Sequence, residues 1–124
     1  MMSRVREALF SILYSTGVLR ESAAILDLFS GAGTVGLEAL SRGMGAATCV
    51  DFSPICAQAI RDNAAGCELA DSVTVVEARV DAVLQSPEAF GLARPYELVT
   101  LTPPYEEVVY ADLIDWVASK DTNE

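Results

Sequence analysis

Apolar and polar positions change their spacing several times along the chain, and each change marks a new element. From Val5 to Ile12 the apolar residues recur every three or four positions, which predicts an amphipathic helix over Arg4–Tyr14. The next apolar run, Ala24–Phe29, is interrupted only by Asp27. A short, nearly continuous run of this kind is typical of a strand buried on both faces of a parallel sheet.

The rest of the chain continues this alternation with short connections. Further strands are predicted over Ala46–Asp51, Ser72–Glu77 and Tyr96–Leu101, and further helices over Thr34–Arg42, Pro54–Ala65, Val80–Gln85 and Val108–Ala118. Strands that alternate with helices require a parallel sheet with right-handed crossovers and helices on both faces. We therefore predict one α/β domain over residues 1–124, with a Rossmann-like sheet of about four strands.

A glycine-rich turn joins the first predicted strand to the helix that follows it. Its glycines are spaced as Gly31-x-Gly33-x-x-Gly36. Gly31 and Gly33 permit a tight turn and close ligand approach because neither has a Cβ, and Gly36 allows the helix to pack closely on the strand. Backbone N–H groups at such a turn suit a nucleotide-like ligand, although glycine turns without any ligand are also common.

Polar or glycine residues follow every predicted strand, at the edge where ligands of parallel sheets bind. These segments are Asp27–Gly33, Asp51–Phe52, Glu77–Arg79 and Thr102–Tyr105. Because polar or glycine residues follow all four strands, the sequence predicts a ligand site at the carboxyl ends of the strands.

Two aspartates at this edge each have a structural and a functional interpretation. Asp27 lies within an apolar strand, where an unpaired carboxylate is costly. It either caps N–H groups of the Gly31–Gly33 turn or receives a ligand ammonium group, directly or through water. Asp51 ends the second strand, and it either accepts hydrogen bonds from both hydroxyls of a ribose or is an ordinary turn residue.

The tetrapeptide Thr102-Pro103-Pro104-Tyr105 follows the fourth predicted strand. Its two prolines fix an extended backbone, so the Thr102 side chain, the Pro103 carbonyl and the Tyr105 ring keep stable directions. The segment is either a rigid turn with a core tyrosine or a part of the site.

Composition limits the classes of function open to the chain. It has no histidine, which excludes Ser/His and Cys/His hydrolase chemistry by this chain alone. Its three cysteines lack CxxC spacing, so we expect no zinc site and a reducing compartment. No apolar run reaches the roughly 18 residues needed to cross a bilayer, and the N-terminus has no signal-peptide core. The net charge of −10 argues against nucleic-acid binding without a basic appendage.

Taken together, these segments resemble the class I S-adenosylmethionine-dependent methyltransferases. The resemblance is greatest to the bacterial family that methylates a guanine N2 in 16S ribosomal RNA, the RsmD-like enzymes. The matching segments are Arg4–Phe10, Asp27–Gly33, Gly36–Gly43, Asp51 and Pro103–Tyr105. The resemblance covers nearly the whole chain and implies a sheet of the class I methyltransferase type.

The resemblance also implies S-adenosylmethionine as the cofactor and a role for individual residues. Asp27 and the Gly31–Gly33 turn would hold the methionine and ribose portion, Asp51 the ribose hydroxyls, and Phe52 would border the adenine. The implied cofactor-binding set is Asp27, Phe29, Ser30, Gly31, Ala32, Gly33, Asp51, Phe52 and Arg79, with no metal.

The implied catalytic set is Thr102, Pro103, Pro104 and Tyr105. In the family's pattern, the first side chain and the neighbouring prolyl carbonyl accept hydrogen bonds from an exocyclic amine. The aromatic ring stacks on the flipped base.

Three features depart from the family's pattern. Thr102 stands where the family has an acid or amide, and its neutral, shorter side chain is a weaker acceptor. Arg79 stands where many relatives accept a hydrogen bond from the adenine amine, which arginine cannot do. The chain also spans only the family's first helix to one helix after the fourth strand. We therefore expect it to lack the N-terminal β-rich segment and the C-terminal strands, which leaves a sheet edge that favours self-association.

The resemblance thus implies methyl transfer to guanine N2 in small-subunit ribosomal RNA or an assembling subunit, with no membrane partner. The expected compartment is a cytoplasm, or the chloroplast stroma or another organelle with a bacterial-type ribosome. Because of Thr102, the alternative is a non-catalytic methyltransferase-like module that binds the cofactor or a partner protein. An NAD-dependent dehydrogenase would share the glycine spacing and Asp51, but it explains neither Asp27 nor the Pro103-Pro104-Tyr105 segment.

Overall fold

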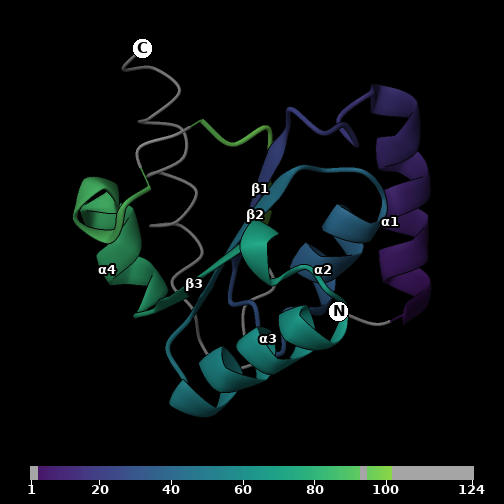
Figure 1. Cartoon of the computed structure of the whole chain (residues 1–124). Coiled ribbons are helices and arrows are strands. Elements are labelled where there is room, and N and C mark those ends of the chain that lie inside the picture. Colours follow the sequence, from purple (N-terminus) through teal and green to yellow (C-terminus); the bar gives the residue numbers. More distant parts are fainter. Residues whose placement is uncertain (1–2, 93–94, 102–124) are drawn as a thin grey trace.

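The computed structural model describes residues 3–92 and 95–101 (Figure 1). The helices are α1 (Ser3–Thr16), α2 (Thr34–Ser41), α3 (Pro54–Gly66) and α4 (Val80–Gln85), and the strands are β1 (Ala24–Leu28), β2 (Ala46–Asp51), β3 (Val73–Glu77) and β4 (Leu98–Leu101). Short 3-10 turns cover Ala70–Ser72 and Pro87–Phe90. The predicted elements within these residues are confirmed, with ends that move by at most two positions. The predicted helix Val108–Ala118 lies outside the described residues.

The four strands form one parallel sheet in the order β3-β2-β1-β4. The chain therefore builds outward from β1 through β2 to β3, and then returns to add β4 on the other side of β1. The connection from β1 runs to β2 on one side of β1, and the connection from β3 crosses to β4 on the other side, so the carboxyl ends of β1 and β4 flank a topological switch point. Ligands of open parallel sheets bind in the crevice at such a point.

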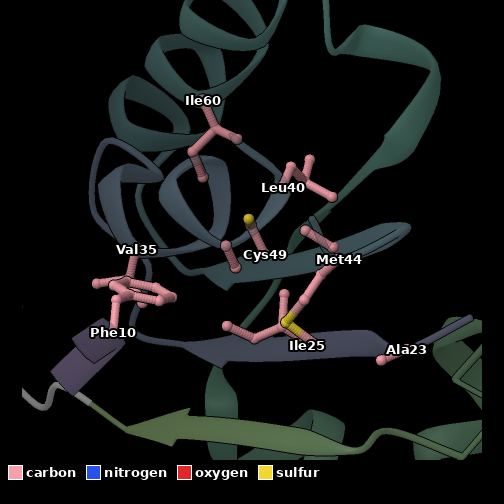
Figure 2. Packing of buried hydrophobic residues seen from close by; sticks show 10 residues of the cluster. Phe10, Ala23, Ile25, Val35, Leu40, Met44, Cys49 and Ile60 are labelled. Carbon is pink, nitrogen blue, oxygen red and sulfur yellow. The ribbon is translucent and has the colours of Figure 1, made fainter. Parts of the chain in front are cut away.

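Helices cover both faces of this sheet, as the sequence predicts (Figure 1). Helices α1, α2 and α3 pack on one face and α4 on the other. The strand β1 contributes to both cores, because Ile25 belongs to the first and Leu26 and Leu28 to the second. Figure 2 shows the first core, in which Phe10 of α1 lies against Val35 of α2.

Helix α2 lies very close to β2 at Gly36, as predicted for this glycine. A Cβ added at Gly36 would meet the Cys49 sulfur at 2.8 Å, which is closer than real Cβ contacts. Cys49 itself is fully buried, as expected for a core residue. The third glycine of the motif therefore serves packing between helix and sheet.

An ion-pair network attaches α1 to α2. Glu38 accepts hydrogen bonds from Arg6 of α1 at 3.3 Å and from Arg42 at 2.8 Å. The Arg42 guanidinium also lies 5.3 Å from the centre of the buried Phe10 ring. These contacts hold the amino-terminal half of α1 beside α2, on the same side of the sheet as the first core.

Apolar side chains remain exposed on the last described strand. Val99 and Leu101 of β4 are exposed, whereas Thr100 between them is buried. Self-association through this edge stays a prediction. Within residues 3–92 and 95–101, no helix is long and apolar enough to span a membrane.

Candidate functional site at the carboxyl ends of the strands

The loop after β1 has an unusual backbone conformation. Phe29, Gly31 and Gly33 all have positive φ, at 59°, 59° and 83°. Glycine adopts this conformation freely, which confirms the predicted tight turn, but a bulky residue such as Phe29 is strained there. The strain persists because the surrounding contacts impose the geometry, a situation that is frequent at functional sites.

Backbone hydrogen bonds fix this loop against the next strand. The Ser30 N–H donates to the Val50 carbonyl of β2 at 2.9 Å, and the Gly33 N–H donates to the Ser30 carbonyl at 3.0 Å. Helix α3 supports the loop from outside, because Asn63 donates its side-chain amide to the Ala32 carbonyl. Ile60 of α3 lies directly against Gly33, where a Cβ would meet its side chain at 3.2 Å.

Asp51 joins the loops that follow β1 and β2. One carboxylate oxygen accepts a hydrogen bond from the Gly31 N–H at 2.8 Å, and the other accepts from the Ser53 N–H at 3.0 Å. Asp51 is therefore a structural turn residue, as one of its two interpretations proposes. An ionised carboxylate has about four acceptor positions, so each oxygen can still accept a further hydrogen bond. The predicted ribose contact fits this geometry and stays a prediction.

Asp27 is almost completely buried, with 1% of its surface exposed. Its two oxygens accept hydrogen bonds from the Ser30 hydroxyl at 2.6 Å and from the Thr100 hydroxyl at 2.8 Å. Burial raises the pKa of this carboxyl above its usual value, and the bonds from Ser30, Thr100 and the backbone of Gly36 oppose that rise.

The interpretation of Asp27 as the acceptor for N–H groups of the Gly31–Gly33 turn is wrong. The Gly31 and Gly33 N–H groups donate to Asp51 and Ser30 instead. The Asp27 carboxylate instead accepts hydrogen bonds from the hydroxyls of Ser30 and Thr100 and from the backbone of Gly36 in the first turn of α2. The predicted ammonium contact stays a prediction.

Sequence reasoning missed Thr100 as a partner in this site. The residue is 7% exposed and lies directly beside Asp27 in the register of β1 and β4. A polar residue inside the apolar run of β4 is the signal that could have found it, because a buried hydroxyl needs a partner. Its pairing with Asp27 depends on the order of the strands, which local sequence does not reveal.

An exposed aromatic ring borders the far side of the same edge. Phe52, just after β2, is 66% exposed, and the Arg79 guanidinium lies 6.0 Å from its ring centre. Arg79 also donates two hydrogen bonds to the Asp81 carboxylate, at 3.0 and 3.1 Å. The resulting ion pair holds the pKa of Asp81 below its usual value. Asp81 is a second member of this edge that the sequence analysis did not identify.

The structure thus gathers the predicted cofactor-binding residues at one edge of the sheet. Asp27, the Phe29–Gly33 loop and Asp51 are linked by hydrogen bonds, and Phe52 and Arg79 lie together beyond β2. The predicted catalytic residues Thr102, Pro103, Pro104 and Tyr105 lie outside the described residues. They follow Leu101 directly in the sequence.

Comparison with known proteins agrees with this geometry. The model of the family described as "Conserved hypothetical protein 95" matches residues 1–122 of the chain. A structure of the YhhF protein of Escherichia coli, provisionally described as a methyltransferase, is 30% identical with a TM-score of 0.77. That alignment covers 94% of this chain and 60% of the E. coli protein.

Two further proteins are similar to this chain. A hypothetical protein from Thermus thermophilus is 30% identical with a TM-score of 0.79, and the match covers 96% of this chain and 65% of that one. An uncharacterized methylase of Rickettsia prowazekii (strain Madrid E) is 45% identical over an alignment of 54 residues, and the match covers 40% of this chain and 23% of the methylase. The chain spans less than two thirds of the length of each of these relatives.

The family match covers almost the whole chain, and the fold has the parallel, helix-covered sheet of the methyltransferase neighbours. The chain therefore belongs to the conserved hypothetical protein 95 family, and it is of the class I S-adenosylmethionine-dependent methyltransferase type that RsmD represents.

Proposed function

We propose that this chain binds S-adenosylmethionine at the carboxyl ends of its strands and transfers a methyl group to the exocyclic N2 amine of a guanine in small-subunit ribosomal RNA. The observation that carries the proposal is the hydrogen bond between Asp51 and the Gly31 N–H. It unites a glycine loop and an acid from the neighbouring strands β1 and β2, next to the topological switch point between β1 and β4, and a nucleoside-bearing ligand fits this end of an open parallel sheet.

Each part of this edge suits a different part of the cofactor. In this proposal the loop of Ser30–Gly33 holds the methionine and ribose portion, with the buried Asp27 behind the loop. The free acceptor positions of Asp51 suit the ribose hydroxyls. The exposed ring of Phe52 offers an apolar face for the adenine, and Arg79 and Asp81 lie beside it.

The chemistry depends on the segment after β4. The bound cofactor supplies an electrophilic methyl group on a sulfonium. The lone pair of a guanine N2 amine is delocalised into the base, so acceptors that draw its N–H bonds aside help to expose it. In this proposal the Thr102 hydroxyl and the Pro103 carbonyl are those acceptors, and the Tyr105 ring stacks on the flipped base.

A second candidate function follows from Thr102 itself. A threonine hydroxyl is a weaker acceptor than the carboxylate or amide that the family's pattern has at this position. In this alternative the chain retains cofactor binding without catalysis, as a module that binds the cofactor or a partner protein.

The charge of the chain affects how RNA reaches the site. A net charge of −10 repels phosphate backbones, so we propose that basic residues from another segment or protein bring the ribosomal RNA or the assembling subunit to this edge. The compartment that we propose is a bacterial cytoplasm, or the chloroplast stroma or another organelle with a bacterial-type ribosome.

The test is methyl transfer from radiolabelled S-adenosylmethionine to small-subunit ribosomal RNA and to immature subunits, followed by nucleoside analysis. Label in N2-methylguanosine is the expected result, and label in any other nucleoside would contradict the guanine assignment. A folded chain that binds the cofactor without transfer would favour the second candidate. A gain of transfer in Thr102→Asp would then identify Thr102 as the cause.

A further inference from the structure

We infer that Thr100 is a positioning residue for the Phe29–Gly33 loop, which is proposed to hold the cofactor. Thr100 acts on Ser30 of this loop through the buried carboxylate of Asp27. The inference rests on the proposed function only in naming the ligand of the loop. The hydrogen bonds from which it is argued all lie within the residues that the structure describes.

The three side chains form one continuous chain of hydrogen bonds across the switch point. Thr100 of β4 donates to one oxygen of Asp27 at 2.8 Å, and Ser30 of the loop donates to the other at 2.6 Å. Asp27 and Thr100 face each other in the β1–β4 register. The carboxylate therefore has a partner from the strand on one oxygen and a partner from the loop on the other.

The burial of these groups makes the geometry restrictive. Asp27 and Thr100 are both buried, so water cannot readily replace a lost hydroxyl as hydrogen-bond donor. Without the Thr100 hydroxyl, the Asp27 carboxylate has to turn or move toward its remaining donors. The Ser30 hydroxyl has to follow, because it is bonded to the same group.

Movement of Ser30 reaches the rest of the loop at once. Its N–H is bonded to Val50 and its carbonyl to the Gly33 N–H, so it fixes both ends of the turn. Thr100 also lies two positions before Thr102 in the sequence. The hydrogen-bonded chain thus ties the loop proposed to hold the cofactor to the strand that leads into the proposed catalytic segment.

The experiment compares Thr100→Val, which removes the hydroxyl at nearly constant shape, with Thr100→Ser, which keeps it. The matched control is Thr74→Val, at an exposed threonine in β3. Two quantities are measured on the full chain: hydrogen exchange of the Ser30, Gly31 and Gly33 amides, and affinity for S-adenosylhomocysteine by calorimetry.

For Thr100→Val we expect loop exchange to be about tenfold faster and the affinity to be about tenfold weaker, as for the loss of one buried hydrogen bond. Thr100→Ser should restore both, and Thr74→Val should change neither. In an Asp27→Asn background, or in Ser30→Ala if that variant does not fold, Thr100→Val should have a much smaller effect on the loop.

Two results would overturn the inference. One is loop exchange that is unchanged in Thr100→Val. The other is faster exchange that is equal in the loop and in the central strands, because this would mean only a general loss of stability. If the wild-type chain does not bind S-adenosylhomocysteine, the proposed function fails, yet the exchange rates still decide whether Thr100 positions the loop.

Discussion

The Asp51 carboxylate accepts a hydrogen bond from the Gly31 N–H at 2.8 Å, although the two residues are 20 positions apart in the sequence. This bond joins the loop after β1 to the loop after β2 at the carboxyl ends of these strands. It also orients a carboxylate toward the space in which we place the ribose.

Replacing Asp51 should therefore affect both stability and cofactor binding. In Asp51→Ala the Gly31 and Ser53 N–H groups lose their acceptor, which should lower the free energy of unfolding by about 1–2 kcal/mol. Affinity for S-adenosylmethionine should fall by at least about tenfold. Urea unfolding and calorimetric titration measure the two effects.

The control for that variant is Asp71→Ala, at an exposed aspartate in the turn that precedes β3. This position lies at the opposite edge of the sheet, so both quantities should remain close to wild type. Equal loss of affinity in the two variants would show that overall charge, and not the Asp51 contact, controls binding.

The buried Asp27 should make stability depend on pH in an unusual direction. Burial raises the pKa of Asp27 in the folded state above its ordinary value of 3.8, so the folded protein holds this proton more tightly than the unfolded chain. The stability that this proton contributes is complete below about pH 3.8 and is lost as the pH rises through the raised folded-state pKa.

Asp27→Asn lacks this titration and provides the comparison. The free energy of unfolding of the wild type, minus that of Asp27→Asn, should fall as the pH rises above 3.8 and then level off. The Glu38 and Asp81 carboxyls, whose pKa values are lowered, are present in both proteins and cancel. A difference that stays constant or grows with pH would contradict the assignment.

Gly36 should not tolerate a side chain while Cys49 keeps its sulfur. The added Cβ of Gly36→Ala would lie 2.8 Å from that sulfur, and overpacking of this kind costs about 1–3 kcal/mol of stability. Cys49→Ala alone should also destabilise, because it leaves a cavity. In the double variant the two effects should partly cancel, as measured by urea unfolding, and simple additivity would mean that the contact is not the cause.

Phe52 should matter for binding much more than for folding. Its ring is mostly exposed, so Phe52→Ala should change the free energy of unfolding by less than about 0.5 kcal/mol. Loss of the apolar face for adenine should weaken S-adenosylhomocysteine binding by about tenfold. Ile55→Ala, at an even more exposed apolar residue of α3, is the control and should bind normally.

The sequence predicts most of this fold because its signals are local. The glycines at 31, 33 and 36, the Ser53-Pro54 helix start and the apolar runs each act over a few residues. The structure confirms their consequences: positive φ at Gly31 and Gly33, close packing at Gly36, and a Ser53 side chain that accepts a hydrogen bond from the Cys56 N–H.

Most of the partners that the sequence did not predict depend on pairing across the sheet. Thr100 reaches Asp27 only because β4 returns to the side of β1, and Asp51 reaches Gly31 only because β2 lies on the other side. The ion pair of Arg79 with Asp81 is local, but its place beside the Phe52 ring also depends on how β2 and β3 pair. Spacing along the chain does not reveal strand order, so these partners were missed.

The most direct test of the account is a calorimetric titration of the whole chain with S-adenosylmethionine and, separately, with NAD. We expect binding of one S-adenosylmethionine per chain, loss of most of that affinity in Asp51→Ala, and no binding of the dinucleotide. A folded, monodisperse chain that binds neither ligand, or that binds only NAD, would contradict the proposed cofactor site.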